Sequence, residues 1–105
     1  DEDSVARALG MVSPKLLRET LQEAVRGSFS KAITQIYGFV VDSGVGELEI
    51  IKQLHREALR LDVPEYLKPE IAYLISEAHY ATLRGASGLA QIFGTLAKIR
   101  SLIGR

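Results

Sequence analysis

Hydrophobic residues recur at intervals of three and four along most of the chain, which is the spacing of one face of an α-helix. The segments with this spacing cover roughly residues 1–9, 13–27, 28–43, 47–61, 64–84 and 88–103. No stretch alternates between polar and apolar residues as a strand would. Because the connections are short, consecutive helices pack as neighbours. The pattern predicts an all-α fold, a compact bundle of five to six helices.

The ends of these segments carry helix-terminating residues. Ser13 followed by Pro14 is typical of an N-cap and a first helical position. Gly10 and Gly85 follow apolar segments, and glycine readily takes the left-handed conformation that closes a helix. Pro69 is compatible with the fifth helix only if it lies in the first turn, where the missing N–H has no intrahelical partner to lose.

The third segment is apolar on more than one side. Its main stripe consists of Phe29, Ala32, Ile33, Ile36, Tyr37 and Val40. Phe39 and Val41 fall outside this stripe. We therefore expect this helix to be covered on more than one face.

The fifth segment has two distinct stripes. The core stripe consists of Leu67, Ile71, Leu74, Ile75, Ala78 and Thr82. Tyr66, Tyr73 and Tyr80 recur every seven residues, with Glu77 and Arg84 on the same side. At about 100° per residue this side points about 140° away from the core stripe. Tyrosine is enriched at interfaces, since it buries a large ring and keeps a polar tip. The pattern predicts a contact face for another chain; the alternative is that the rings cover the edge of their own bundle.

The sixth segment has a seam at steps of three and four that suits a neighbouring helix. We include it with the tyrosine stripe in one candidate subunit interface. Its members are Tyr66, Tyr73, Glu77, Tyr80, Arg84, Leu89, Ile92, Phe93, Leu96, Ile99 and Ile103.

Length and composition limit the classes of protein. With 105 residues and 47 % hydrophobic content, residues 1–105 can form a single domain around one core. The 13 basic and 13 acidic side chains cancel, so the overall charge does not attract nucleic acid or an anionic membrane. Without cysteine there is no disulfide or thiol chemistry, which is compatible with the reducing cytoplasm where we expect the protein. No apolar run approaches the roughly 20 residues of a membrane span.

The first residues read Asp1, Glu2 and Asp3, without the basic and apolar regions of a secretory signal. Acids usually form the first turn of a helix whose cap precedes them. We therefore expect the chain to be part of a longer protein.

Candidate chemistry is sparse. The chain has no phosphate-binding glycine loop and no HExxH or GxSxG motif. His55 and His79 are its only histidines, fewer than the three or four ligands of a zinc site. His55 shares its stripe with Ile51 and Ala58, which predicts a hydrogen-bonded residue at the core edge; for His79 we expect an ordinary surface role, with titration at an interface as the alternative. We expect no catalytic residue, cofactor or metal in this chain.

Positive charge gathers at the C-terminal end. From Gly85 onward the chain has Lys98, Arg100 and Arg105 but no acid. The simplest interpretation is that these cations complement the negative end of the last helix dipole; the alternative is contact with nucleic acid.

A second group of basic residues lies on the fourth segment. Lys52, Arg56 and Arg60 follow one another at steps of four and form a basic ridge. We expect this ridge to be a solvated face.

Four stretches of the sequence together carry a family resemblance. They read DEDS at 1–4, VARALGMVSP at 5–14, IIKQLHREALRLDVPEYLKPEIAYLISEAHY at 50–80 and RGASGLAQIFGTLAKI at 84–99. In order and spacing they resemble the C-terminal domain of the archaeal replication factor C small subunit, over nearly the whole chain.

The resemblance implies a role in DNA replication. In that family an ATP-driven clamp loader of one large and four small subunits places a sliding clamp on primer–template DNA, and the C-terminal helical domains form a collar. It implies contact with other small and large subunits through the collar. ATP, Mg²⁺, the clamp and the DNA would be bound by an AAA+ ATPase region preceding Asp1. The chain itself is then no enzyme. A helical nucleic-acid-binding module using the basic C-terminal helix is the alternative, and a stand-alone enzyme ranks third.

The chain also departs from the family pattern. Family members commonly carry arginine at the position of Ala81, asparagine at Ser87 and a larger aliphatic residue at Ala90. Gly88 and Gly94 lie within the last helix, each costing about 1 kcal/mol relative to alanine. These departures are compatible with a divergent small-subunit paralogue with different neighbours in the ring.

Overall fold

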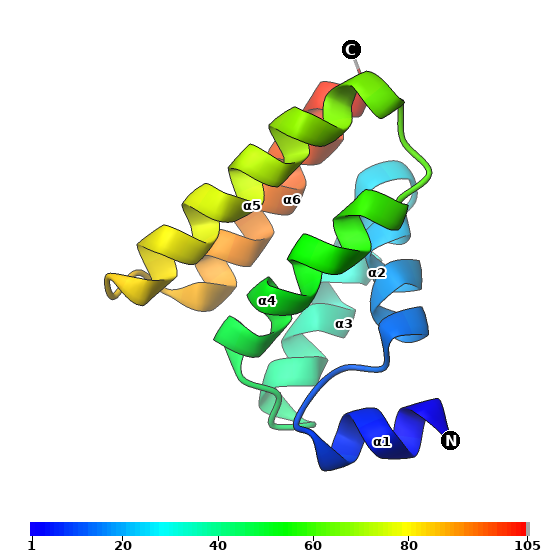
Figure 1. Ribbon diagram of the computed structural model, residues 1–105, viewed down its shortest axis with the longest axis vertical. Coiled ribbons are helices and arrows are strands. Elements are labelled where there is room, and N and C mark those ends of the chain that lie inside the picture. The colour runs from blue at the N-terminus through cyan, green and yellow to red at the C-terminus, as the bar shows by residue number, and fades with distance from the viewer. Residues whose placement is uncertain (105) are drawn as a thin grey trace.

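The computed structural model describes residues 1–104, all of whose regular elements are helical. The α-helices are α1 (Glu2–Ala8), α2 (Pro14–Arg26), α3 (Phe29–Val41), α4 (Glu47–Glu57), α5 (Lys68–Leu83) and α6 (Gly88–Ile103), and short 3₁₀ helices cover Ala58–Arg60 (η1) and Glu65–Leu67 (η2) (Figure 1). Within this range no residue is in a strand. The predicted all-α class is confirmed, and each predicted segment contains the expected helix.

The helix ends follow the predicted chemistry. The Ser13 hydroxyl accepts a hydrogen bond from the Leu16 backbone N–H at 3.5 Å, and Pro14 is the first residue of α2. Gly10 and Gly85 both have positive φ, the left-handed conformation that glycine adopts without a steric penalty. Pro69 lies in the first turn of α5, where it removes no hydrogen bond of the helix.

The start of α1 differs from the expectation in one respect. Asp1 is itself the N-cap, since its carboxylate accepts a hydrogen bond from the Ser4 backbone N–H at 2.7 Å. The prediction that the cap precedes the three acids was therefore wrong: a single aspartate can serve as cap as well as acid at the positive end of the helix.

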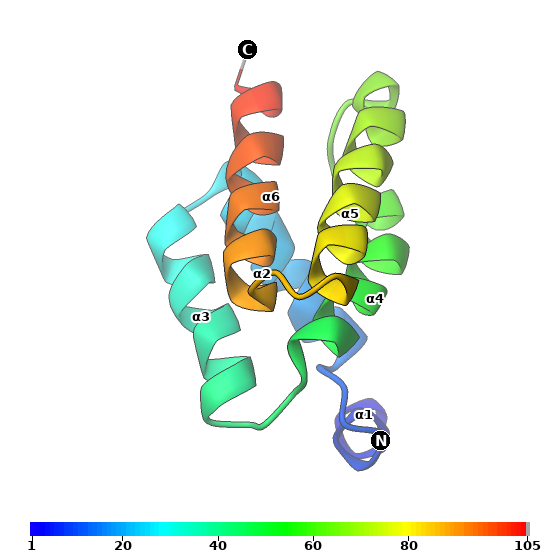
Figure 2. The same cartoon turned by 90° about the vertical axis from the view of Figure 1, so that its left-hand side faces the viewer.

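The helices enclose one hydrophobic core. α2 packs against α3 and α6, and α5 packs against α4 and α6, while α1 extends from one end (Figures 1 and 2). The largest fully buried apolar side chains are Leu17, Leu21, Ile36, Ile50, Ile51, Leu54, Ile71, Ile75, Ile92, Leu96 and Ile99. In Figure 2, α3 and α5 lie on opposite sides of the molecule with α6 between them, and both run from top to bottom.

The structure corrects one expectation about which side chains of α3 are buried. Ala32 and Ile36 are fully buried, and Phe39 packs partly against the core. Tyr37, which the sequence pattern placed on the core stripe, is 52 % exposed, and Val41 is 55 % exposed. α3 packs against α2 and α6 at the edge of the bundle. Its outer face is therefore uncovered in this chain.

Two buried polar side chains tie α4 to the preceding part of the chain. The Gln53 amide bonds twice to the Val12 backbone: Nε2 donates to the carbonyl oxygen at 2.7 Å, and Oε1 accepts from the N–H at 3.1 Å. The buried Glu57 carboxylate accepts from Arg18 at 3.0 Å and pairs with Arg60 at 3.4 Å. Both groups are buried with partners, as buried polar groups must be if they are not to destabilise the fold.

Candidate subunit interface

The predicted tyrosine stripe, with Tyr66 in η2 and Tyr73 and Tyr80 in α5, is exposed to solvent. Tyr66 is 80 % exposed, Tyr73 62 % and Tyr80 60 %. The opposite stripe of the helix is buried, with Ile71 and Ile75 in the core. The two faces of α5 are thus separated as the sequence indicates, and three large rings remain without cover in this chain.

The C-terminal end of this stripe has a local structure of its own. The Arg84 guanidinium lies over the Tyr80 ring, with its central carbon 5.6 Å from the ring centroid. This separation is within the range of a cation–π contact. Glu77 is exposed beside the pair, and Leu83 is exposed one turn after Tyr80. Aromatic, apolar and charged groups therefore meet at the C-terminal end of α5.

The α6 part of the candidate interface is largely internal. Ile92, Leu96 and Ile99 are buried and lie in the core of the same chain. The seam does pack against neighbouring helices, but these are α2, α3, α4 and α5 of the same chain. These three residues are accordingly removed from the candidate interface.

The remaining α6 candidates are only partly available. Leu89, Phe93 and Ile103 are half-buried and pack against the core. They have some exposed surface, but most of their apolar contact is internal. They can contribute to the border of an interface, not to its centre.

Arg100, one of the three basic residues near the C-terminus, is used inside the fold. The Arg100 guanidinium donates from Nη1 to the carbonyl oxygens of Ala24 and Gly27, at 3.0 and 2.8 Å. It thereby caps the C-terminal end of α2, where carbonyl groups lack helical partners. The sequence suggested that Arg100 complements the dipole of α6. The structure shows that it also caps α2. Lys98 is exposed, and Arg105 lies outside the described residues.

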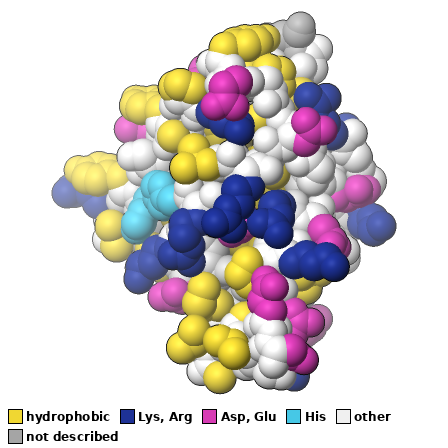
Figure 3. Space-filling view, turned by 45° about the vertical axis from the view of Figure 1, so that its right-hand side comes forward, with side chains coloured by type: hydrophobic (Ala, Val, Ile, Leu, Met, Phe, Trp, Pro, Cys, Tyr) yellow, Lys and Arg dark blue, Asp and Glu magenta, His cyan; other side chains and the backbone are white. Residues whose placement is uncertain are grey.

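The ridge on α4 is a solvated basic surface, as predicted. Lys52, Arg56 and Arg60 are exposed. In Figure 3, lysine and arginine side chains gather beside the histidines near the middle of the face. Lys52 pairs with Glu49 at 3.4 Å, and Arg60 pairs with the buried Glu57. These partners offset part of the positive charge, so the ridge is less attractive to polyanions than its sequence suggests.

The two histidines form a pair between α4 and α5. His55 Nε2 lies 3.0 Å from His79 Nδ1, and both residues are half-buried. The prediction of a hydrogen-bonded His55 is confirmed, whereas the surface role expected for His79 was wrong, because α5 brings it against α4. Burial, and then the nearby His79, lower the pKa of His55 below its ordinary value of 6.5.

This pair predicts a loss of stability in mild acid. The folded chain holds His55 neutral, while the unfolded chain takes up a proton near pH 6.5, so the unfolded state binds more protons below that pH. The contribution of neutral His55 to the free energy of unfolding is therefore fully present above about pH 6.5. It is lost as the pH falls from there towards the lowered pKa of His55 in the folded chain. We expect the melting temperature to fall as the solution is acidified from neutral pH to about pH 5, and to fall less in His55→Gln; an equal fall in both would assign the effect to other groups.

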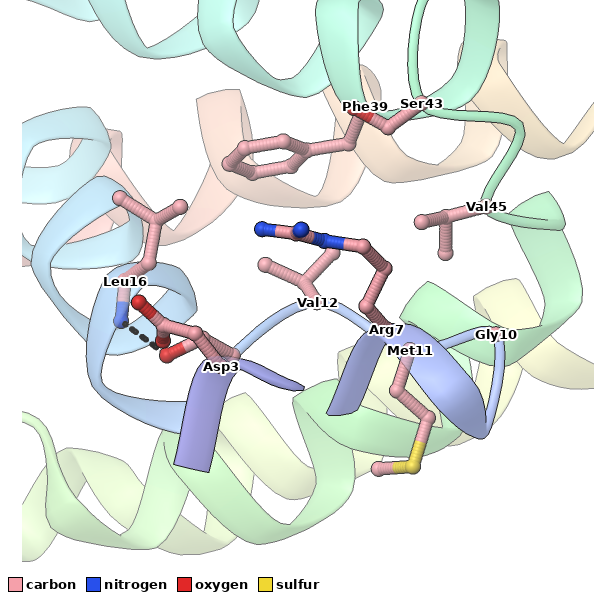
Figure 4. A pocket seen from close by; sticks show the side chains of 10 residues that line it. Asp3, Arg7, Gly10, Met11, Val12, Leu16, Phe39, Ser43 and Val45 are labelled. Atoms are coloured by element: carbon pink, nitrogen blue, oxygen red, sulfur yellow. Dashed lines mark hydrogen bonds between the residues drawn. The ribbon is translucent and has the colours of Figure 1, made fainter. Parts of the chain in front are cut away.

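The best-defined pocket lies under α1 and is too small for most ligands. Arg7 points into it between Val12 and Phe39, and Leu16 closes the far side (Figure 4). Its volume of about 190 Å³ is below the roughly 300–1,000 Å³ of ligand sites. The dashed bond in that view joins Leu16 to the Ser13 cap and is structural.

Other kinds of site are not apparent in the described part of the chain. Across residues 1–104, no three His, Cys, Asp or Glu side chains gather as they would around a metal ion. Over the same range, none of the helices is both long and apolar enough to pass through a membrane.

Tyr37, Val41 and Leu83 are exposed apolar residues that sequence reasoning did not include in the interface. Leu83 could have been found, because it lies three residues after Tyr80 on the same side of α5. The exposure of Val41 could also have been predicted, since this residue falls outside the core stripe of its helix. The exposure of Tyr37 could not have been predicted, because it results only from the position of α3 at the edge of the bundle.

Comparison with known proteins identifies the family. Residues 12–98 match the family model of the replication factor C C-terminal domain. The chain is 81 % identical to "Replication factor C small subunit 2" of Pyrobaculum islandicum over 102 residues, 97 % of this chain and 32 % of the relative. It is 76 % identical to the protein of the same name from Pyrobaculum aerophilum over 97 % of this chain and 32 % of that relative.

More distant relatives match over a similar range. "Replication factor C small subunit" of Sulfurisphaera tokodaii is 33 % identical over 99 residues, 92 % of this chain and 30 % of that protein. The chain thus spans about a third of the length of these curated relatives. No solved structure matches it. The helical bundle with its exposed α5 face belongs to the replication factor C C-terminal domain family.

Proposed function

We propose that this chain is the oligomerisation, or collar, domain of a clamp-loader small subunit. It holds copies of the subunit together with other small and large subunits of replication factor C. In the whole protein, an ATPase region that uses ATP and Mg²⁺ would act on the sliding clamp and on primer–template DNA. The chain contributes contacts to this assembly and no chemistry.

The exposed tyrosine stripe of α5 is the observation that carries this proposal. A monomeric protein rarely leaves two large rings and a leucine exposed along one helix, with a third exposed ring, Tyr66, in η2 directly before it. Such a row marks an interaction surface. Family membership supports the same role, since the relatives are named as subunits of a complex. The match to proteins named "small subunit 2" favours a paralogue with its own neighbours in the ring.

The nucleic-acid alternative has less support. It needed Lys98, Arg100 and Arg105 together, but Arg100 is used to cap α2, and of the other two only Lys98 lies among the described residues, where it is exposed. Without Arg100, fewer cations are available for the phosphate contacts that make nucleic-acid binding depend on salt.

Replacing Tyr73 and Tyr80 together by alanine should weaken assembly and leave the fold intact. Truncating interface tyrosines costs about 1–2 kcal/mol or more each, so we expect the dissociation constant to rise about thirtyfold or more. Light scattering over a concentration series measures the assembly, and circular dichroism measures the helix content.

Two results would contradict this proposal. One is unchanged assembly in the double variant, which would place the contact elsewhere. The other is loss of helix content together with assembly, which would make the tyrosines structural. Lys98→Ala serves as the control, because it removes an exposed side chain of α6 and should change neither quantity.

A further inference from the structure

We propose that copies of this chain associate head to tail, with the tyrosine stripe of α5 in one copy packing against the outer face of α3 in the next. The α3 face consists of Thr34, Tyr37 and Val41. The inference rests on the proposed function and adds to it the second surface and the direction of pairing.

The α3 face has the spacing of a helix contact. Thr34, Tyr37 and Val41 follow one another at steps of three and four, so they form one stripe. All three are exposed, with Tyr37 and Val41 more than half so. An aromatic and a β-branched side chain side by side on a helix offer an apolar surface that matches the rings of α5 in kind.

The two helices that carry these faces lie on opposite sides of one molecule. In Figure 2, α5 forms the right edge and α3 the left edge, with α6 between them. Two different patches on opposite edges can repeat from copy to copy, which gives a heterologous interface and an extended or ring-shaped assembly. A self-complementary pair of α5 helices would stop at a dimer and leave α3 uncovered.

The direction of the helices brings complementary charges to the same level. Both helices run from top to bottom in Figure 2, so copies turned about a vertical axis place α5 beside a parallel α3. Along α5 the charges beside the tyrosines run from acidic, Glu70 and Glu77, to basic, Arg84. Along α3 and its C-cap they run from basic, Lys31, to acidic, Asp42.

The spacing of these charges also agrees. At the pitch of an α-helix, Lys31 and Asp42 lie about three turns apart, and Glu70 and Arg84 about four. If Asp42 of one copy lies level with Arg84 of the neighbouring copy along the helix axis, Lys31 lies at a height between Glu70 and Glu77 of that neighbouring copy. Lys31 also lines a groove of its own chain together with two acidic side chains of α2, so the pair of Asp42 with Arg84 gives the clearer test.

Complementation between two variants tests the pairing. One variant carries Tyr73→Ala and Tyr80→Ala and keeps α3 intact; the other carries Tyr37→Ala and Val41→Ala and keeps α5 intact. We expect the unchanged chain to assemble beyond twice its mass of 11.5 kDa as concentration rises. At a concentration just sufficient to assemble the unchanged chain, each variant alone should be largely monomeric, and an equimolar mixture should form a dimer that grows no further.

The outcomes separate this inference from the proposed function. If the α3 variant assembles as the unchanged chain does, or the mixture stays monomeric while the unchanged chain assembles, the head-to-tail pairing is overturned and the collar role stands. If the unchanged chain stays monomeric even at millimolar concentration, both fail.

A charge exchange gives a second test that leaves the tyrosines in place. Asp42→Arg and Arg84→Asp should each weaken assembly severalfold, and the two together in one chain should restore most of it. An α5-to-α5 dimer would be insensitive to Asp42→Arg, and that result would also overturn the pairing. Circular dichroism of every variant checks that the helices are retained.

Discussion

Replacing Gln53 by alanine is expected to lower the free energy of unfolding by about 2–4 kcal/mol, a large part of the roughly 5–15 kcal/mol of a typical domain. Gln53 and Val12 are both buried. The substitution removes both amide bonds to the Val12 backbone. It leaves a buried N–H and a buried carbonyl without partners, each of which costs about 1–3 kcal/mol.

The chain contains a matched control for this prediction. Gln22 makes the same two bonds to the Asp62 backbone, donating from Nε2 at 3.3 Å and accepting at Oε1 from the N–H at 3.0 Å. Asp62 is exposed, so water can replace the amide. The gain in helix propensity from glutamine to alanine is common to both sites and cancels. We expect Gln22→Ala to cost less than about 1 kcal/mol.

Guanidinium chloride unfolding, followed by circular dichroism, measures both variants under the same conditions. The expected result is a lower midpoint for Gln53→Ala at a nearly unchanged slope. Equal losses at the two sites would show that burial does not determine the value of these bonds. It would also remove the argument that Gln53 anchors the loop before α2 to α4.

Gly88→Ala is expected to destabilise the chain by about 2–4 kcal/mol, although alanine is the better helix former. Gly88 is buried at the start of α6, and a Cβ there would lie 2.5 Å from both Cβ and Oε2 of Glu47. The Cβ of Glu47 is fixed to its backbone and cannot turn away. Either α4 or α6 must move, and the bond from the Leu89 N–H to Glu47 Oε2, 2.7 Å long, is then strained or lost.

Gly94→Ala in the same helix should have the opposite sign. Gly94 is exposed, and an added Cβ would meet no atom within 4 Å. Alanine then gains helix propensity without a clash, which raises the free energy of unfolding by about 1 kcal/mol. The same denaturation experiment measures both changes. Stabilisation by Gly88→Ala would contradict the close approach of α4 and α6, and destabilisation by Gly94→Ala would contradict the open surroundings of Gly94.

These two glycines show what sequence patterns alone cannot separate. Both interrupt the same helical segment, so propensity assigns them the same cost. Only the structure shows that Gly88 permits contact between two helices while Gly94 faces solvent. The difference arises from Glu47, which lies two helices earlier in the chain, and no local pattern contains that contact.

The candidate interface divides in the same way. The rings of Tyr66, Tyr73 and Tyr80 were predicted to be exposed because α5 carries a second, apolar stripe that the core must bury, and the structure agrees. Ile92 and Leu96 form an equally regular stripe, but it fills the core of this chain. A stripe indicates that a helix has a partner; it does not indicate whether the partner belongs to the same chain.

By itself, the sequence determined which segments are helical, where they end and which stripes are apolar, because propensity, capping and periodicity act over a few neighbouring residues. The tertiary structure decided what each face meets: the pairing of His55 with His79, the capping of α2 by Arg100, and the exposure of Tyr37 and Val41 at the edge of the bundle. The physical reason is that contacts between distant helices depend on how all of them share one core, which is a property of the whole chain and not of any segment.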